Sequence, residues 1–233
     1  HQEFDVIRNI VAHLGDRPGL GINIGVHSTV GRAGVIGFLL LASPTVRAGA
    51  ELAIPYLALS PTHLRITIEE DDEYAYVVAD DSELPPDVRR FIVERDLAGL
   101  GTAMAGAQIS LTPLRLETTL DEASMVKLAQ VWGLDPADSR AGCPVNRLVG
   151  PRPLLDVPLP QADPNTARIF ARQCHDLLER RVARVGVTGQ VRSRLLHNPG
   201  HLPSMATIAV ELHMDSRTLR RKLTAEGTSF RAL

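Results

Sequence analysis

The sequence has few of the features that mark specialised classes of protein. Its 233 residues include 2 cysteines, and Cys143 and Cys174 fit neither a zinc-binding nor a redox spacing. No stretch approaches the roughly 18 uninterrupted apolar residues of a membrane-spanning helix; the longest candidate, residues 35–42, is too short. No run of basic and then apolar residues opens the sequence, so we expect no signal peptide. Together with the cysteine spacing and the short apolar stretches, this predicts a reduced, cytoplasmic location and no membrane partner.

Composition and charge narrow the class further. Hydrophobic residues make up 44% of the chain and charged residues 22%, which excludes a disordered, collagen-like or coiled-coil protein. Residues 190–233 hold seven basic and three acidic side chains, whereas residues 1–189 hold 18 basic and 24 acidic ones. A segment of charge +4 that follows a body of charge −6 indicates that the C-terminal end meets a polyanion.

Hydrophobic periodicity predicts an α+β protein. We expect helices in residues 2–14, 31–42, 46–59, 87–104, 120–132, 165–185 and 190–196, and a pair of helices in residues 204–227. Residues 63–69 and 74–79 alternate as the strands of a β-hairpin do, and shorter strand-like stretches are 108–116 and 146–149. Thr45 can cap the helix that follows it, a role that Ser43 could share, and Pro55 should kink or break that helix. The fold class is therefore an N-terminal domain of helices and antiparallel sheet, followed by a small all-α unit.

The C-terminal end of the chain carries the strongest functional pattern. Ser204 is suited to cap a short helix, and Asp215 is suited to cap a second one in which Leu219 and Leu223 point inward. Ala209 leaves room for the two helices to cross closely. Helix, tight turn and helix in this order are typical of the unit that lays its second helix in the major groove of DNA.

The outward face of the second predicted helix is rich in arginine. Arg217, Arg220 and Arg221 follow one another at i, i+3 and i+4, so they share one surface stripe. A guanidinium stays charged and presents paired N–H groups that fit guanine or a phosphate. Arg217 and Thr218 lie in the turn that reaches base edges first, and Lys222 points toward phosphate or water. The alternative is an ordinary solvated face, which the preceding capped helix disfavours.

One residue departs from the usual pattern. His213 stands in the turn where helix-turn-helix units favour glycine, because the backbone there often has a positive φ. A histidine in that conformation costs roughly 1 kcal/mol more than glycine but is tolerated.

Two sets of motifs carry a resemblance to a known family. The C-terminal set is Leu202-Pro203-Ser204, Ile208-Ala209, Leu212-His213-Met214, the run from Arg217 to Leu223, and the run from Ala225 to Phe230. It resembles the DNA-binding domain of AraC/XylS-family transcription regulators. The preceding residues are similar to the arabinose-binding-type N-terminal domain of one branch of that family, in Leu41 to Thr45, Leu59-Ser60-Pro61, Cys143-Pro144-Val145 and Pro158 to Pro164.

The resemblance implies an effector-responsive, sequence-specific DNA-binding transcription regulator of bacterial type, without enzymatic activity. Its partners would be double-stranded DNA and a small-molecule effector, and a homodimer is an open option. We assign residues 1–164 to effector binding, 165–189 to a connecting helix with a hinge at 186–189, and 190–233 to the first half of a helix-turn-helix domain. The predicted DNA-binding set is Arg217, Thr218, Arg220, Arg221 and Lys222.

The effector site is harder to place from the sequence. Polar tips on an apolar cavity wall could come from Tyr56, His63, Arg65, Tyr74 and Trp132. The alternative for each of them is that it only packs the core. No metal or cofactor is expected, because Cys174 and His175 point ~100° apart on one helix and the glycine clusters at 19–25 and 99–106 lack a dinucleotide-binding spacing.

Two other functions stay open at this point. One is a ligand-sensing or protein-interaction module that does not bind DNA directly. Measurable binding to a random DNA duplex at low salt, even if weak, would exclude such a module. The other is an enzyme with an unrecognised site, although the sequence contains no nucleophile elbow and no paired helical histidines.

Overall fold

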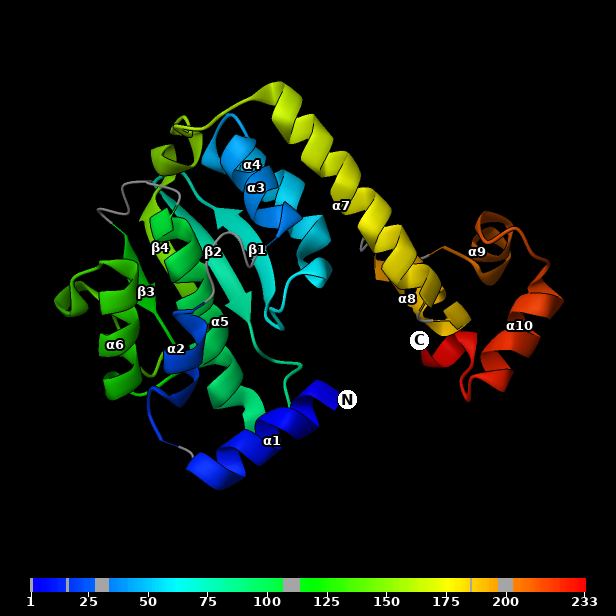
Figure 1. Cartoon of the computed structure of the whole chain (residues 1–233), viewed down its shortest axis with the longest axis horizontal. Coiled ribbons are helices and arrows are strands. Elements are labelled where there is room, and N and C mark those ends of the chain that lie inside the picture. Colours follow the sequence, from blue (N-terminus) through cyan, green and yellow to red (C-terminus); the bar gives the residue numbers. More distant parts are fainter. Residues whose placement is uncertain (1, 16, 28–33, 107–113, 185, 197–202) are drawn as a thin grey trace. The chain divides into compact units, whose positions relative to one another are not determined.

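The structure is a computed structural model, which describes residues 2–15, 17–27, 34–106, 114–184, 186–196 and 203–233 (Figure 1). The chain divides into two compact units, His1–Cys174 and His175–Leu233, and each has a hydrophobic core of its own. No helix in the described ranges is long and apolar enough to cross a bilayer. The unit boundary falls within the helix expected at 165–185, so the domain limits at 164 and 189 stay predictions.

The first unit combines helices with one antiparallel sheet. Its helices are α1 (Gln2–Leu14), α2 (Leu20–Gly25), α3 (Val35–Ala42), α4 (Val46–Ala53), α5 (Pro86–Gly106), α6 (Glu122–Trp132) and the first part of α7 (Pro164–Arg184). Its strands are β1 (Arg65–Glu70), β2 (Tyr74–Asp80), β3 (Arg115–Glu117) and β4 (Asn146–Pro151), and its 3-10 segments are η1 (Ile54–Leu59), η2 (Pro136–Asp138) and η3 (Arg152–Asp156). The strands pair in the order β1-β2-β4-β3, which confirms the α+β class.

The sheet turns one face toward α5. Strand alternation places Ala79 of β2, Leu148 of β4 and Leu116 of β3 on that face, where Leu116 is fully buried. Val88 and Ile92 of α5 belong to the same apolar cluster. The hairpin of β1 and β2 is confirmed, whereas most of the stretch predicted as a strand at 108–116 lies outside the described residues.

The sequence pattern did not predict α2. Gly21 and Gly25 lie so close to α5 that a β-carbon would come within 2.2 and 2.3 Å of backbone carbonyl oxygens of that helix. The buried Glu94 carboxylate accepts hydrogen bonds from the N–H groups of Gly19 (2.7 Å) and Gly21 (2.9 Å) and so caps α2. This glycine cluster therefore serves close helix packing.

Local signals placed the breaks around α4 correctly. The Thr45 hydroxyl accepts a hydrogen bond from the Ala48 N–H at 3.2 Å, as an N-cap does. Ser43 does not share this role, because its hydroxyl donates to the Leu39 carbonyl at 2.7 Å. The α-helix ends two residues before Pro55 and continues as η1, which confirms the predicted break.

The second unit contains only helices among its described residues: the last part of α7, α8 (Gly186–Leu196), α9 (Met205–Glu211), α10 (Ser216–Ala225) and the 3-10 turn η4 (Phe230–Ala232). Its core consists of Val187, Val191, Ile208, Ala209, Leu219 and Leu223. Residues 186–189 were expected to form a hinge ahead of a helix, but they are the first turn of α8. The physical reason is that the Glu226 carboxylate, at the C-terminal end of α10, accepts hydrogen bonds from N–H groups of that turn and so caps it.

Candidate nucleic-acid interface

Side-chain caps fix where α9 and α10 begin. The Ser204 hydroxyl accepts a hydrogen bond from the Thr207 N–H at 3.1 Å, and the Asp215 carboxylate accepts one from the Thr218 N–H at 2.7 Å. The hydrogen bonds from Thr218 lower the pKa of Asp215 below its ordinary value, so this cap is charged at neutral pH. Both caps are the ones that the sequence predicted.

The inner side of the helix pair is apolar. Ile208 and Ala209 of α9 are 0% and 1% exposed, and Leu219 and Leu223 of α10 are 0% and 1% exposed. Because Leu219 and Leu223 lie one turn apart, burying both of them sets the rotation of α10 about its axis. The opposite side of α10 must then face solvent.

The turn between the two helices has the backbone strain that the sequence indicated. His213 has φ +54°, and among the described residues it is the only one other than glycine with a positive φ. Its N–H donates to the Val210 carbonyl at 3.0 Å, and the Met214 N–H donates to the Ala209 carbonyl at 2.9 Å. These bonds hold the chain in the sharp turn that leads into α10.

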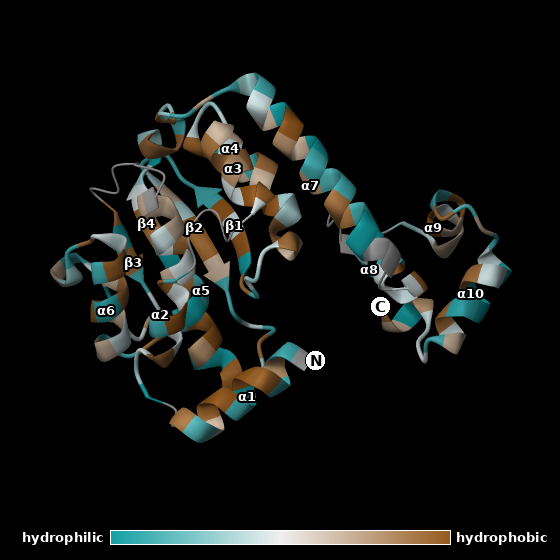
Figure 2. Ribbon diagram, viewed as in Figure 1, coloured by the Kyte–Doolittle hydropathy of each residue, from teal (hydrophilic) through white to brown (hydrophobic). Residues whose placement is uncertain are grey.

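The outward side of α10 carries four exposed cations. Arg217, Arg220, Arg221 and Lys222 are exposed, and their side chains make no hydrogen bond or ion pair within the part of the chain that the structure describes. Figure 2 shows α10 dominated by hydrophilic residues, in contrast to the hydrophobic α3. These cations are therefore available to an external anion.

Two polar side chains near this surface, those of Thr218 and Arg194, already have partners within the protein. Thr218 is half-buried, and its hydroxyl donates to the Asp215 carboxylate at 3.0 Å, which leaves only oxygen lone pairs for another partner. Arg194 of α8 donates to the Gln190 carbonyl at 3.1 Å and lies 3.4 Å from the Glu211 carboxylate. Four exposed cations of the second unit therefore lie on α10, while Arg192 of α8 and Arg231 of η4 are exposed outside it.

Sequence reasoning missed one residue that positions this surface. Glu226, at the C-terminal end of α10, accepts hydrogen bonds from the N–H groups of Val187 (2.9 Å) and Thr188 (2.7 Å) in the first turn of α8. Contact with the Thr188 side chain and these two N–H groups lowers the pKa of Glu226. At Gly186 a β-carbon would come within 2.8 Å of the carboxylate, so glycine fits there. Glu226 therefore fastens α10 to α8.

The five predicted effector side chains lie against other residues of the first unit. Trp132 is 3% exposed, and its indole N–H donates to the Leu97 carbonyl at 3.1 Å. Tyr56 is half-buried against a separate apolar cluster of the first unit. These two placements match the core-packing alternative.

The other three predicted effector residues have protein partners as well. The His63 ring lies 3.3 Å from the Glu3 carboxylate. Arg65 donates to Asp80 at 2.5 Å, and this hydrogen bond lowers the pKa of Asp80 to about 2. The centre of the Tyr74 ring lies 5.4 Å from the guanidinium carbon of Arg115 in β3.

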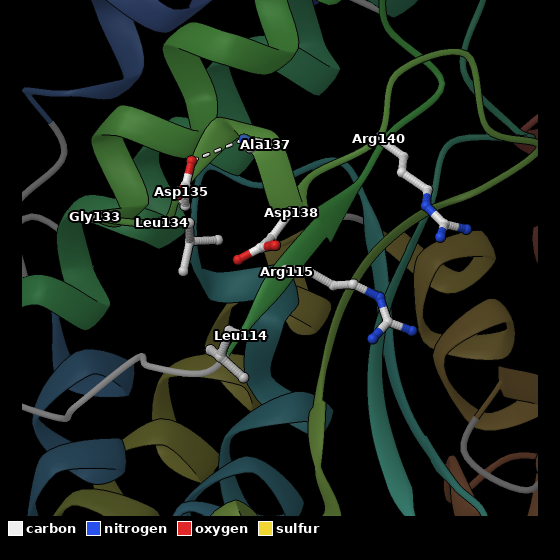
Figure 3. A pocket seen from close by; sticks show the side chains of 8 residues that line it. All are labelled: Leu114, Arg115, Gly133, Leu134, Asp135, Ala137, Asp138 and Arg140. Atoms are coloured by element: carbon white, nitrogen blue, oxygen red, sulfur yellow. Dashed lines mark hydrogen bonds between the residues drawn. The ribbon is translucent and has the colours of Figure 1, made fainter.

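A pocket of about 490 Å³ opens beside the edge strand β3 (Figure 3). Its lining consists of Leu114, Arg115, Gly133, Leu134, Asp135, Ala137, Asp138 and Arg140. None of the five predicted effector residues belongs to it. Within the described ranges, no group of three or more His, Cys, Asp or Glu side chains is placed to hold a metal ion.

Comparisons with known proteins extend over both units. Residues 1–159 match the family described as the N-terminal arabinose-binding domain of AraC transcription regulators. An uncharacterised helix-turn-helix transcriptional regulator of Mycobacterium tuberculosis is 37% identical over 99% of this chain and 68% of its own length. The ornithine utilization regulator of Pseudomonas aeruginosa is 26% identical over 98% of this chain and 67% of its own length.

A solved structure shares the fold. The transcriptional regulator CdpR from Pseudomonas aeruginosa matches with a TM-score of 0.56 and 20% sequence identity. The match covers 96% of this chain and 72% of that one. At this level of identity the likeness concerns the fold alone.

Proposed function

We propose that this chain, which belongs to the AraC family of transcription regulators, contacts double-stranded DNA through α10 and responds to a small molecule bound in its first unit. As a family member it is a DNA-binding transcription regulator with an effector-binding domain. The relatives are named as regulators and not as enzymes. What we propose is which residues carry out recognition.

The observation that carries this assignment is the set of unpaired guanidinium groups on α10. Arg217, Arg220 and Arg221 are exposed and have no partner in the described chain, while the other side of the helix is locked into the core. A helix held at a fixed rotation presents its side chains in a fixed pattern, which recognition of an ordered double helix requires. The excess positive charge of this segment adds attraction to phosphates.

We assign different roles along the helix. Arg217 lies in the first turn and is placed to reach base edges, where a guanidinium donates two hydrogen bonds to guanine O6 and N7. Arg220 and Arg221 lie one turn later and would contact a base edge or clamp phosphates. Lys222 is a phosphate contact, and Thr218 supports the cap while its hydroxyl oxygen faces the groove.

We also propose an oligomeric state and a cellular location, which membership of the family does not specify. A homodimer is supported by exposed apolar side chains of the first unit, since Phe38 is 44% and Ile169 is 55% exposed. Sedimentation at several protein concentrations tests this. We place the regulator in the bacterial cytoplasm, where its DNA partner is found.

Effector binding is proposed to change how the second unit meets DNA. The first turn of α8, residues 186–189, is the segment where we expect the response, because the Glu226 carboxylate and the core contact of Val187 join it to α10. Amide hydrogen exchange of Val187 and Thr188 should change when the effector binds. Exchange that is insensitive to every effector that changes DNA affinity would contradict this coupling.

Fluorescence anisotropy with labelled duplex DNA tests the proposed function. At low salt we expect binding even to a random duplex, with an affinity that falls steeply as salt rises. A chain that binds no duplex at low salt would contradict the assignment and favour a ligand-sensing or protein-interaction module.

A further inference from the structure

We propose that the pocket beside β3 binds a small zwitterionic amino acid with an apolar side chain. This inference rests on the proposed function, in which the first unit binds an effector, and it names the class of that effector. The pocket volume of about 490 Å³ falls in the range of roughly 300–1,000 Å³ that small-molecule sites occupy. All of its lining residues belong to the first unit.

Two opposite charges at this pocket have no side-chain partner among the described residues. The Arg140 guanidinium and the Asp138 carboxylate both line it, and neither side chain makes a hydrogen bond or ion pair to another described residue. Backbone hydrogen bonds hold the Arg140 segment against β3, with the Arg140 N–H donating to the Leu116 carbonyl at 2.8 Å. The two charges thus line the pocket from one anchored segment, with the Asp138 carboxylate nearer Leu134 and the Arg140 guanidinium on the opposite side (Figure 3).

A second guanidinium is held in place on the same side of β3. Arg115 lies 3.3 Å from the Glu117 carboxylate and 5.4 Å from the centre of the Tyr74 ring. These contacts use part of its donor set and fix its orientation. Figure 3 shows the guanidinium ends of Arg115 and Arg140 on one side of the pocket, where a carboxylate could accept from both.

The remaining wall is apolar. Leu114 and Leu134 lie on the other side of the pocket from the two guanidinium groups, with Asp138 between (Figure 3). Leu134 is buried and Leu114 is half-buried, so they form a fixed surface on which an alkyl group can pack.

The three kinds of surface together define the ligand. A carboxylate matches the paired guanidinium groups, an ammonium matches Asp138, and a short alkyl side chain matches the two leucines. A neutral polyol would satisfy neither charge, and a simple fatty acid would leave Asp138 without a partner. An apolar α-amino acid carries all three features on adjacent carbons.

Isothermal titration calorimetry of the whole chain without DNA tests the proposal. The probe is L-leucine, compared with 4-methylpentanoate, which lacks its ammonium, and with 3-methylbutylammonium, which lacks its carboxylate. We expect L-leucine to bind with a Kd of about 1 mM or tighter. Each analogue should bind at least about tenfold more weakly, because each loses a charge-assisted hydrogen bond.

Variants locate the binding in the pocket. Arg140→Met and Asp138→Asn should each weaken L-leucine binding at least about tenfold, whereas the matched control Arg172→Met, at an exposed arginine of α7 outside the pocket, should leave it unchanged. Circular dichroism establishes that each variant is folded.

Three results would overturn the proposal: no heat from L-leucine at concentrations well above 1 mM, equal binding of 4-methylpentanoate, or binding unchanged in both pocket variants. DNA affinity measured without any small molecule tests the proposed function separately. A chain that binds duplex and not L-leucine would therefore contradict only this inference.

Discussion

Arginine side chains have different surroundings in the two units. In the first unit most of them are paired within the protein: Arg47 donates to both Glu70 and Asp156, and Arg147 donates to Glu117. On α10 of the second unit, Arg217, Arg220 and Arg221 make no side-chain hydrogen bond or ion pair within the described chain, and Lys222 has only a longer-range attraction to Glu226. Residues 216–225, which form α10, contain no Asp or Glu, and the carboxylates at its two ends, Asp215 and Glu226, accept hydrogen bonds from backbone N–H groups.

This difference separates two uses of the same residue. A paired guanidinium joins elements of the fold, as Arg47 joins α4 to β1 and η3. An unpaired guanidinium on a rigid helix contributes little to folding and is free to bind a polyanion. If the comparison is right, substitutions of arginine should affect stability in the first unit and DNA binding in the second.

The largest effect is expected when all three α10 arginines are removed. The triple variant Arg217→Ala, Arg220→Ala, Arg221→Ala should lose DNA affinity by about a thousandfold or more, since each contact is worth roughly 1–3 kcal/mol. Its thermal midpoint should stay close to that of the unmodified chain. Anisotropy and thermal melting measure the two properties.

The matched control for the triple variant is Arg47→Ala in the first unit. We expect it to lower the thermal midpoint, because the contacts to Glu70 and Asp156 are lost, and to leave DNA affinity unchanged. The opposite pattern, in which Arg47→Ala impairs DNA binding and the triple variant only unfolds more easily, would break the comparison.

A single substitution measures the contribution of one α10 arginine to DNA binding. Arg221→Ala should weaken binding about tenfold and reduce the slope of log K against log salt by about 1 if it removes one phosphate contact. Arg172→Ala, which removes an exposed arginine from α7, is the control. An affinity and a slope both equal to those of the unmodified chain would remove Arg221 from the interface.

Glu226 should make the attachment of α10 dependent on pH. The pKa of Glu226 is lower in the folded chain than in the unfolded chain. Its contribution to the stability of the second unit is therefore fully present above the pKa of the unfolded chain, about 4.3. This contribution is lost as pH falls through the pKa of the folded chain. Glu226→Gln should therefore reduce amide protection of Val187 and Thr188 at neutral pH. Hydrogen exchange between pH 3 and 7 measures this.

Asp215 also has a lowered pKa and loses its own contribution in acid, so the difference between the unmodified chain and Glu226→Gln isolates Glu226. Glu179→Gln, at an exposed position of α7, serves as the control. Equal protection of the α8 amides in Glu226→Gln and in the control would show that the carboxylate does not fasten α10 to α8.

The smallest effect is expected in the turn before α10. His213→Gly should stabilise the second unit by about 0.5–1 kcal/mol, because glycine adopts a positive φ without strain and this gain exceeds its extra freedom when unfolded. His213→Ala keeps the β-carbon and should bring no such gain. Urea unfolding compares the two, and equal stabilities would mean that the turn is not strained by the side chain.

Sequence reasoning succeeded where a feature depends on neighbouring residues. The caps at Thr45 and Asp215, the break at Pro55 and the positive φ of His213 each follow from a few adjacent side chains, and the structure contains all of them. The stripe of arginines on α10 is likewise a matter of helical spacing.

Features that depend on distant contacts were missed. The helix α2 packs closely on α5 because Gly21 and Gly25 have no side chains, and no local sequence pattern predicts that contact. Glu226 caps a helix that begins 40 residues earlier in the chain, at Gly186. The effector set stays a prediction, because residue type alone does not indicate which side chains meet, as Trp132 in the core illustrates.

The unpaired arginines of α10 should contact DNA, whereas the paired arginines of the first unit should not. Nuclear magnetic resonance of the arginine Nε–Hε groups, recorded while duplex DNA is added, tests this most directly. We expect the signals of Arg217, Arg220 and Arg221 to shift and those of Arg47 and Arg65 to keep their positions. Stationary α10 signals beside shifted first-unit signals would contradict it.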